Sequence, residues 1–203
     1  ARSEGGLLQK VKIPRSQMSL QTASQFEIGS ESEEYMKSLK IPYIPQININ
    51  ACGAAALEMI YKYYGLNDVN QQELMKKYQE LEPHGSGNFR LTTDNLIMDA
   101  RSKGFKTGWA RANWSNPLDS ISLLQLLTDA GIPVIVCQKF TEEQPLIGHF
   151  RIVLGVDKEK IYLHDPNPEI GGPNIEWAIE KFIDFWKPTG DNVTGGILIF
   201  VSK

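Results

Sequence analysis

Three residues of this chain have the types and positions needed for nucleophilic catalysis. Cys52 follows the Asn-rich residues 46–51 and directly precedes a helical sequence, so its thiol is expected at a helix N-terminus. Unpaired backbone N–H groups and the helix dipole favour the thiolate there, so the pKa of the thiol is expected to fall below its ordinary value of about 8.5. His149 opens a strand-like segment and Asp165 ends the next one. The sequence therefore predicts a thiol nucleophile, an imidazole base and an orienting carboxylate.

The choice of base and orienting residue depends on the surroundings of each candidate. Of the three histidines, His149 follows a glycine that leaves room for a thiol, whereas His84 lies in a glycine-rich loop and is the second candidate. His164 precedes Asp165 in the same strand, so its side chain is expected on the opposite face. Asn167 is the alternative orienting residue. The structural alternatives are a hydrogen-bonded core histidine and an aspartate that forms a turn before proline.

The two cysteines are expected to have different roles. Cys137 lies in an apolar strand-like segment and is predicted to be a core residue, which is also the structural alternative for Cys52. A disulfide between the two would block the proposed nucleophile, so none is predicted. The cysteines and histidines are not spaced as pairs of metal ligands, and no phosphate-binding glycine loop is present. No cofactor is therefore expected.

Short blocks around these residues resemble the bacterial bacteriocin-processing (double-glycine leader) cysteine peptidase family, which belongs to the papain-like superfamily. The blocks are Gln46 six residues before Cys52, Gly53 with the Ala-rich helix that ends in Tyr-Tyr-Gly, Gly-His149 at a strand start, and Asp165 before proline. The resemblance covers approximately residues 40–203. It implies a papain-like fold and a peptide or protein substrate.

The resemblance also implies a role for each residue. Cys52 attacks a peptide carbonyl to form a thioester acyl-enzyme, His149 acts as general base, and Asp165 accepts the Nδ1 proton of His149 and so orients it. Gln46 and the backbone N–H of Cys52 bind the oxyanion of the tetrahedral intermediate. The implied substrates end in small residues such as Gly-Gly. Two other functions fit the same residues, namely an acyltransferase with the same triad and a non-catalytic peptide-binding module.

The order of the predicted elements indicates an α+β domain. Residues 1–30 are polar and are predicted to form a flexible N-terminal extension, and residues 31–203 form the predicted domain. Helices precede strands, so a helical lobe with a central nucleophile helix is expected to pack on an antiparallel sheet, with the cleft between them. The predicted helices cover residues 30–39, 54–64 (capped by Asn48 or Asn50), 70–81, 93–104, 123–130 and 174–186, and the strands cover 133–137, 150–156, 160–164 and 196–201.

Composition argues against other classes of protein. The 203 residues carry a net charge of −3 and no cluster of Lys and Arg interleaved with aromatics, so nucleic acid is not an expected partner. No apolar run approaches the roughly 20 residues of a membrane-spanning helix, so no integral membrane segment is expected. The first residue is Ala1 rather than Met, which favours a secreted or periplasmic location after removal of a signal over the cytoplasm. The sequence predicts no oligomeric state.

Overall fold

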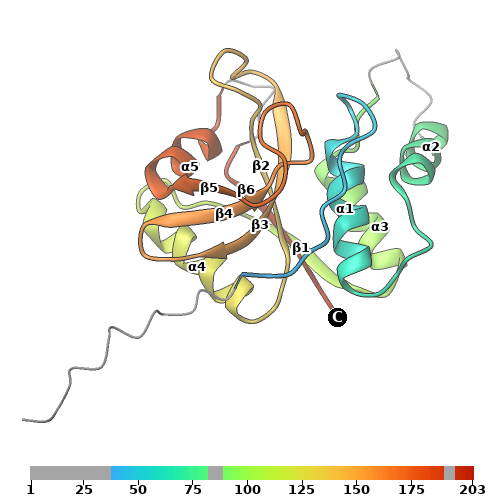
Figure 1. Ribbon diagram of the computed structural model, residues 1–203, viewed down its shortest axis with the longest axis horizontal. Helices are drawn as coiled ribbons and strands as arrows, with labels where there is room; N and C mark the ends of the chain where they lie inside the picture. The colour runs from blue at the N-terminus through green and yellow to red at the C-terminus, as the bar shows by residue number, and fades with distance from the viewer. Residues whose placement is uncertain (1–37, 82–88, 190–194) are drawn as a thin grey trace, which may run out of the picture. The chain divides into compact units, whose positions relative to one another are not determined.

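A six-stranded antiparallel sheet with helices against both faces organises the described part of the chain (Figure 1). The computed structural model describes residues 38–81, 89–189 and 195–203, all within the unit Met36–Lys203. The predicted extension 1–30 and most of the predicted helix 30–39 lie outside the described residues. Ser38 and Leu39, the last two residues of that helix, are not helical.

The sheet brings together strands that are distant in the sequence. Its order is β1-β6-β2-β3-β4-β5, and every neighbouring pair is antiparallel. β6 therefore lies inside the sheet, between β1 and β2. The strands are β1 (Lys106–Arg111), β2 (Val134–Lys139), β3 (Gly148–Val156), β4 (Lys160–His164), β5 (Ile175–Ala178) and β6 (Ile197–Ser202).

Two apolar cores fill the space on either side of the sheet. The first core packs helices α1 (Cys52–Tyr63), α2 (Gln71–Leu81) and α3 (Thr93–Ser102) against one face. The second packs α4 (Pro117–Asp129) and α5 (Ile179–Trp186) against the other face. The α+β class and the antiparallel sheet are as predicted, but helices cover both faces rather than forming one lobe on one side.

Helix α1 packs against the sheet with small residues at its N-terminal end. Every residue from Cys52 to Tyr61 is buried, and the run of alanines lets the helix backbone approach β3. A Cβ added at Gly53 would lie 3.1 Å from the Phe150 ring and 3.3 Å from Leu96. Gly53 therefore permits the close packing that places Cys52 beside the start of β3.

The predicted cap of α1 is wrong. The N-cap is Ala51, which provides no side-chain hydrogen bond to the helix. The Asn48 side chain instead accepts a hydrogen bond from the backbone of Asn50 at 2.9 Å, within the loop before the helix. The first turn of α1 thus begins without the side-chain acceptor that usually occupies a helix N-terminus.

A buried carboxylate connects the three helices of the first core. Asp99 in α3 is fully buried and accepts hydrogen bonds from Tyr61 (2.7 Å), Lys77 (2.7 Å), Tyr78 (3.2 Å) and Lys103 (2.7 Å). Burial alone would raise the pKa of Asp99, but the hydrogen bonds from Lys103, Lys77 and Tyr61 outweigh it and lower the pKa. The network therefore stabilises the fold at neutral pH, and this contribution is lost as the pH falls through the lowered pKa.

The helix predicted over residues 174–186 is wrong in its first third. Asn174 has a positive φ of 52°, and the next four residues form β5, which pairs with β4. Ile175 and Trp177 alternate with exposed Glu176, a pattern that suits an edge strand as well as a helix. Pairing with β4 decides between the two, and α5 begins only at Ile179.

Two further elements differ from the prediction. Strand β1 was not predicted because its Lys-Thr-Gly-Trp-Ala-Arg sequence has little apolar alternation, and it forms through pairing with β6. Helix α4 begins at Pro117, six residues before the predicted start, since proline suits the first turn of a helix. The other predicted strands and the helices near residues 71 and 93 are confirmed. No helix within the described ranges is long and apolar enough to cross a membrane.

Candidate active site

The predicted site residues come from three elements that meet at one end of the sheet. Cys52 is the first residue of α1, His149 the second residue of β3, and Asp165 follows the last residue of β4. All three are buried, with 3%, 2% and 0% of their surface exposed. Packing of α1 against β3 and pairing of β3 with β4 therefore fix their relative positions.

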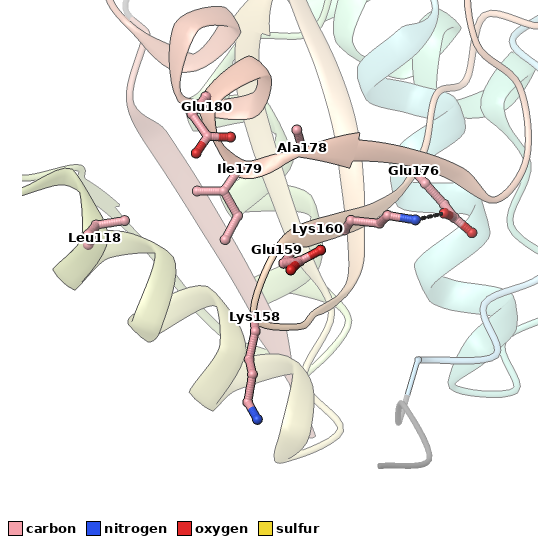
Figure 2. A pocket seen from close by; sticks show the side chains of 8 residues that line it. All are labelled: Leu118, Lys158, Glu159, Lys160, Glu176, Ala178, Ile179 and Glu180. Carbon is pink, nitrogen blue, oxygen red and sulfur yellow. Dashed lines mark hydrogen bonds and ion pairs between the residues drawn. The ribbon is translucent and has the colours of Figure 1, made fainter. Parts of the chain in front are cut away.

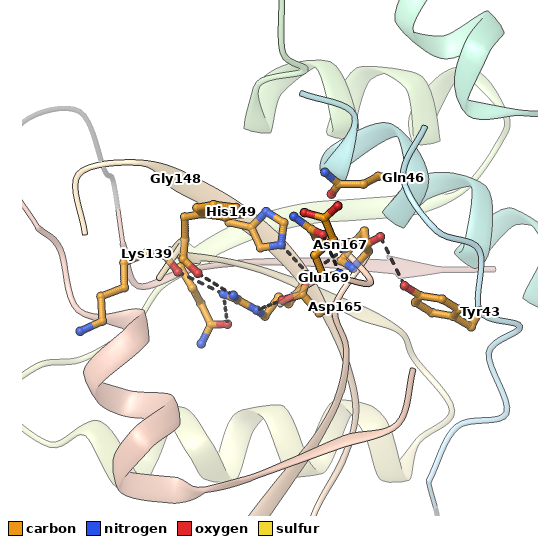
Figure 3. Close-up of polar contacts among 12 residues, drawn as sticks. Tyr43, Gln46, Lys139, Gly148, His149, Asp165, Asn167 and Glu169 are labelled. Carbon is orange, nitrogen blue, oxygen red and sulfur yellow. Dashed lines mark hydrogen bonds and ion pairs between the residues drawn. The ribbon is translucent and has the colours of Figure 1, made fainter. Parts of the chain in front are cut away.

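The imidazole of His149 contacts Asp165 through a short hydrogen bond. His149 Nε2 lies 2.7 Å from Asp165 Oδ1 (Figure 3). The prediction that Nδ1 faces Asp165 is therefore wrong. With Nε2 facing the carboxylate, the other ring nitrogen is left for the hydrogen bond that joins the imidazole to the Cys52 thiol.

The environment of Cys52 favours its thiolate. Burial would raise the pKa of the thiol, but the charge of His149 and its hydrogen bond to sulfur outweigh burial and lower the pKa. The backbone N–H of Phe150 and the charge of Arg90 act in the same direction. Arg90 is held beside the site because its Nε donates to Asn50 Oδ1 at 2.9 Å.

The pKa of His149 moves in the opposite direction. Burial would lower it, but the charge of Cys52 and the hydrogen bond to Asp165 outweigh burial and raise the pKa. A lowered thiol pKa together with a raised imidazole pKa favours a thiolate–imidazolium pair over two neutral groups. The arrangement is thus suited to attack by sulfur on a carbonyl carbon and to proton donation by the imidazolium.

Asp165 is held as a carboxylate by donors on both oxygens. Oδ1 accepts from His149 and from the backbone N–H of Asn167 at 2.9 Å, and Oδ2 accepts from Arg151 Nε at 2.7 Å. Burial would raise the pKa of Asp165, but the hydrogen bond and charge of His149 and the charge of Arg151 lower it. The side chain of Asn167, the alternative orienting residue, is turned to Glu169 N at 3.0 Å.

Gln46 lies beside this group, but its amide is not oriented as the oxyanion role requires. Its backbone N–H donates to Pro166 O at 2.8 Å, which attaches it to the loop after Asp165. Its side-chain Nε2 donates to Asn48 O at 2.9 Å. Among the buried side-chain atoms that the structure describes, Gln46 Oε1 lacks a hydrogen-bond partner. Figure 3 places Gln46 close to His149 and Asn167.

His164 does not take part in the site. His164 is buried, with Nε2 at 2.9 Å from Ile41 O and Nδ1 accepting from Asn174 N at 3.0 Å, so it faces away from Asp165 as expected. Burial lowers its pKa. His84 lies outside the described residues.

Comparisons with known proteins identify the family of this chain. A family model described as the Peptidase_C39 like family matches residues 38–194. The chain belongs to the Peptidase_C39 like family. Two curated relatives are the "Transport/processing ATP-binding protein ComA" of Streptococcus pneumoniae strains R6 and TIGR4, each 28% identical over 153 residues. The match covers 74% of this chain, and the chain spans only 18% of the length of these relatives.

Solved structures of related peptidase domains share the fold. The peptidase domain of Streptococcus ComA superposes with a TM-score of 0.56 at 22% identity, covering 79% of this chain and 96% of that one. A double glycine motif protease from an AMS/PCAT transporter, in complex with the leader peptide, gives a TM-score of 0.54 at 21% identity over 82% and 94% of the two chains. These likenesses agree with the helices and the antiparallel sheet of this chain.

A pocket in this C39-like chain is lined by Cys52. It has a volume of about 340 Å³, and its walls include Cys52, Arg90, Leu146 and Phe150. A second pocket of about 360 Å³ shares Cys137 and Phe150 with the first and extends toward β1. The two pockets together carry apolar side chains, two arginines and one aspartate.

A larger pocket lies elsewhere and carries no nucleophile. It has a volume of about 540 Å³ between α4, the β4 hairpin and the β5–α5 junction (Figure 2). Lys160 and Glu176 on its wall form an ion pair at 2.9 Å. It shares no lining residue with the pocket at Cys52, so size alone does not identify the active site.

Cys137 is buried as predicted, but it lies beside the site rather than in a remote core. It lines the same pocket as Cys52, and both cysteines are free. Burial and the charge of Cys52 raise the pKa of Cys137 to about 12. Cys137 is therefore a neutral thiol at physiological pH and does not compete with Cys52 as a nucleophile.

Sequence reasoning missed two cations of the site. Arg151 stands two residues after His149, and residues two apart in a strand share a face. A single charge among the apolar residues of β3 is a sequence signal that was available. Arg90 precedes α3 by three residues, and nothing in its local sequence indicates that it approaches Cys52.

Gly171 leaves space for the orienting carboxylate, and we expect Gly171→Ala to impair the site. A Cβ there would lie 2.7 Å from Asp165 Cβ and 3.1 Å from Oδ2, too close for either side chain to stay in place. Displacing Asp165 by part of an ångström should slow alkylation of Cys52 at neutral pH on the order of tenfold. The neighbouring Ile170→Ala, which leaves the glycine intact, is the control. Equal rates for Gly171→Ala and wild type would contradict the predicted coupling.

Proposed function

We propose that this chain is a cysteine peptidase that cleaves peptide bonds through a thioester on Cys52. The observation that carries the proposal is the buried group of Cys52, His149 and Asp165. Within it the pKa of the thiol is lowered and that of the imidazole is raised, which favours the thiolate–imidazolium pair. Family membership and the likeness to peptidase domains support the same reaction. The catalytic domain is proposed to comprise residues 31–203, after an N-terminal extension.

The proposed reaction proceeds in two halves. The Cys52 thiolate attacks the carbonyl carbon, and the His149 imidazolium gives its proton to the nitrogen of the leaving amine as the C–N bond breaks. The acyl group then remains on sulfur as a thioester. In the second half, His149 removes a proton from water while the water oxygen attacks the thioester, which releases a carboxylic acid and restores the thiolate–imidazolium pair.

Gln46 is proposed to assist both halves as an oxyanion donor with the backbone N–H of Cys52. Its amide must first turn away from Asn48, because the atom without a partner in the free protein is the oxygen. Rotation about the last side-chain bond exchanges the two amide atoms and presents an N–H group in place of that oxygen. Nε2 then loses its hydrogen bond to Asn48 O and donates to the developing oxyanion instead.

The proposed substrates are peptides cut after two small residues. The double glycine motif protease bound to its leader peptide supports this assignment, since this chain shares its fold. In this chain, β3 starts with Gly148 next to Cys137, and an added Cβ there would contact Cys137 Sγ at 3.7 Å. Gly148 also lines the pocket at Cys52, so this part of the pocket wall carries no side chain.

The test is acylation of Cys52 by synthetic peptides. A peptide with an internal Gly-Gly and a matched peptide with Val-Val at the same positions are incubated with the protein, and products and protein mass are followed by mass spectrometry. We expect cleavage after Gly-Gly, a transient acyl mass on Cys52, and much slower cleavage of the Val-Val peptide. Glycinamide is added in a parallel series as a competing amine.

The alternative functions are distinguished by the outcome. Preferential appearance of the glycinamide adduct would assign an acyltransferase rather than a hydrolase. Binding of the peptide with no acyl mass at Cys52 and no product would assign a non-catalytic peptide-binding module and refute the peptidase. Equal cleavage of both peptides would retain the peptidase and refute the specificity for small residues.

A further inference from the structure

Arg151 is a buried cation of β3 that hydrogen-bonds to Asp165 and to residues near the end of β2. Only 1% of its surface is exposed, although burying an unpaired guanidinium costs several kcal/mol. Nε donates to Asp165 Oδ2 at 2.7 Å, on the opposite side of the carboxylate from His149. Arg151 is therefore the second charged partner of the residue that orients the proposed base.

The remaining donors of Arg151 hold its position. Nη1 donates to Lys139 O at 3.1 Å and to Gln138 Oε1 at 3.4 Å, and Nη2 donates to Phe140 O at 2.8 Å. All these acceptors belong to the end of β2 and the residue that follows it. A planar group with three bonded nitrogens has little freedom to move, so it acts as a fixed reference for the carboxylate.

Two aromatic rings next to the guanidinium complete its environment. The Arg151 guanidinium carbon lies 4.9 Å from the centre of the Trp177 ring and 5.6 Å from that of Phe185. These rings come from β5 and α5, so two further elements stabilise the charge of Arg151. A lysine at this position would keep the charge but lose the planar fork.

We infer that Arg151 is a positioning residue of the active site, which fixes the Asp165 carboxylate with Oδ1 toward His149 and balances its charge with a permanent cation. The inference rests on the proposed function, because it concerns the pair that activates Cys52. It goes further in assigning one more residue to the site, which acts on His149 and Cys52 through Asp165.

The charges around His149 determine the sign of the expected effect. The charged groups are Cys52 from α1, Asp165 after β4 and Arg151 from β3, with Arg90 close to Cys52. The Cys137 thiol from β2 is also titratable but neutral. Burial lowers the pKa of His149, the charge of Cys52 and the hydrogen bond to Asp165 raise it, and the charge of Arg151 lowers it. Loss of Arg151 therefore leaves the charge of Asp165 unbalanced and should raise the pKa of His149 further.

The experiment measures the titration of His149 directly, in full-length protein carrying Cys52→Ala. NMR signals of the His149 imidazole are followed against pH with Arg151, with Arg151→Met and with Arg101→Met, a control that removes one positive charge from α3. Arg151→Met should raise the pKa of His149 by about one unit. Arg101→Met should leave it in place. A His149 pKa that is the same with Arg151 and with Met would overturn the inference.

Arg151→Lys provides a second test if the Met variant does not fold. It keeps a cation in the core, so the pKa of His149 should stay near its starting value, whereas alkylation of Cys52 in an otherwise unmodified chain should slow several-fold because the carboxylate is held less firmly. Alkylation at the wild-type rate would overturn the positioning role. The titration needs no catalysis, so a protein that shows the shift but cleaves no peptide would refute the peptidase proposal and not this one.

Discussion

Replacing Cys52 with serine is expected to reduce peptide hydrolysis by about 10⁴-fold or more, with little loss of stability. Serine fits the same buried position, but its hydroxyl remains protonated under conditions in which the Cys52 thiol is ionised by His149, Phe150 N–H and Arg90. The measurement is kcat/KM for the Gly-Gly peptide, together with thermal unfolding to show that the variant is folded.

Cys137→Ser is the matched control for that substitution. It removes the other cysteine of the same pocket, but this thiol is neutral because its pKa is raised to about 12. Its rate should fall by less than about tenfold, which is small beside the loss at Cys52. Loss of activity in Cys137→Ser with retention in Cys52→Ser would reverse the assignment of the nucleophile.

Replacing His149 with alanine is expected to abolish the rapid alkylation of Cys52 near pH 6. Without the charge and hydrogen bond of His149, burial is the largest remaining influence, and it raises the pKa of the thiol. The thiolate fraction at a pH below the pKa falls tenfold for each unit by which the pKa rises, so a decrease of about 100-fold or more is expected. The measurement is iodoacetamide labelling of Cys52 from pH 5 to pH 10, read by mass spectrometry.

The wild-type pH profile follows from the same two shifts. Hydrolysis should appear as the pH rises through the lowered pKa of Cys52 and disappear as it rises through the raised pKa of His149, because the imidazolium is then lost. His164→Gln is the control for His149→Ala, since the His164 imidazole hydrogen-bonds to Ile41 and Asn174 instead of Asp165. Unchanged labelling near pH 6 in His149→Ala would exclude His149 as the group that ionises the thiol.

The local sequence predicts which residues form the candidate site better than it predicts how their side chains are oriented. Cys52 before an alanine-rich helix and His149 at a strand start are visible as patterns, because helix and strand periodicity place one end of each element. Which ring nitrogen of His149 meets Asp165 depends on how two strands and a helix pack, and no spacing encodes it. The same holds for the amide of Gln46, whose orientation is set by a carbonyl two residues away.

The elements that were mispredicted form through distant partners. β1 has weak strand character of its own and pairs with β6 about 90 residues later. β5 carries a helical pattern and becomes a strand by pairing with β4. Arg151 is a charged residue in a core strand, and it is stable there only because Asp165, three oxygens near the end of β2 and two rings converge on it. In each case tertiary contacts outweigh local preference.

The internal place of β6 has a consequence for synthesis on the ribosome. β1 and the free edge of β2 both pair with β6, so neither can complete its hydrogen bonds until residues 197–202 have been made. At the usual rate of translation, β1 waits for its partner for roughly 4 to 17 s. During that interval the nascent chain presents unpaired strand edges, which attract other strands and molecular chaperones. Folding of the sheet is therefore completed late, when an internal strand is supplied from the far end of the sequence.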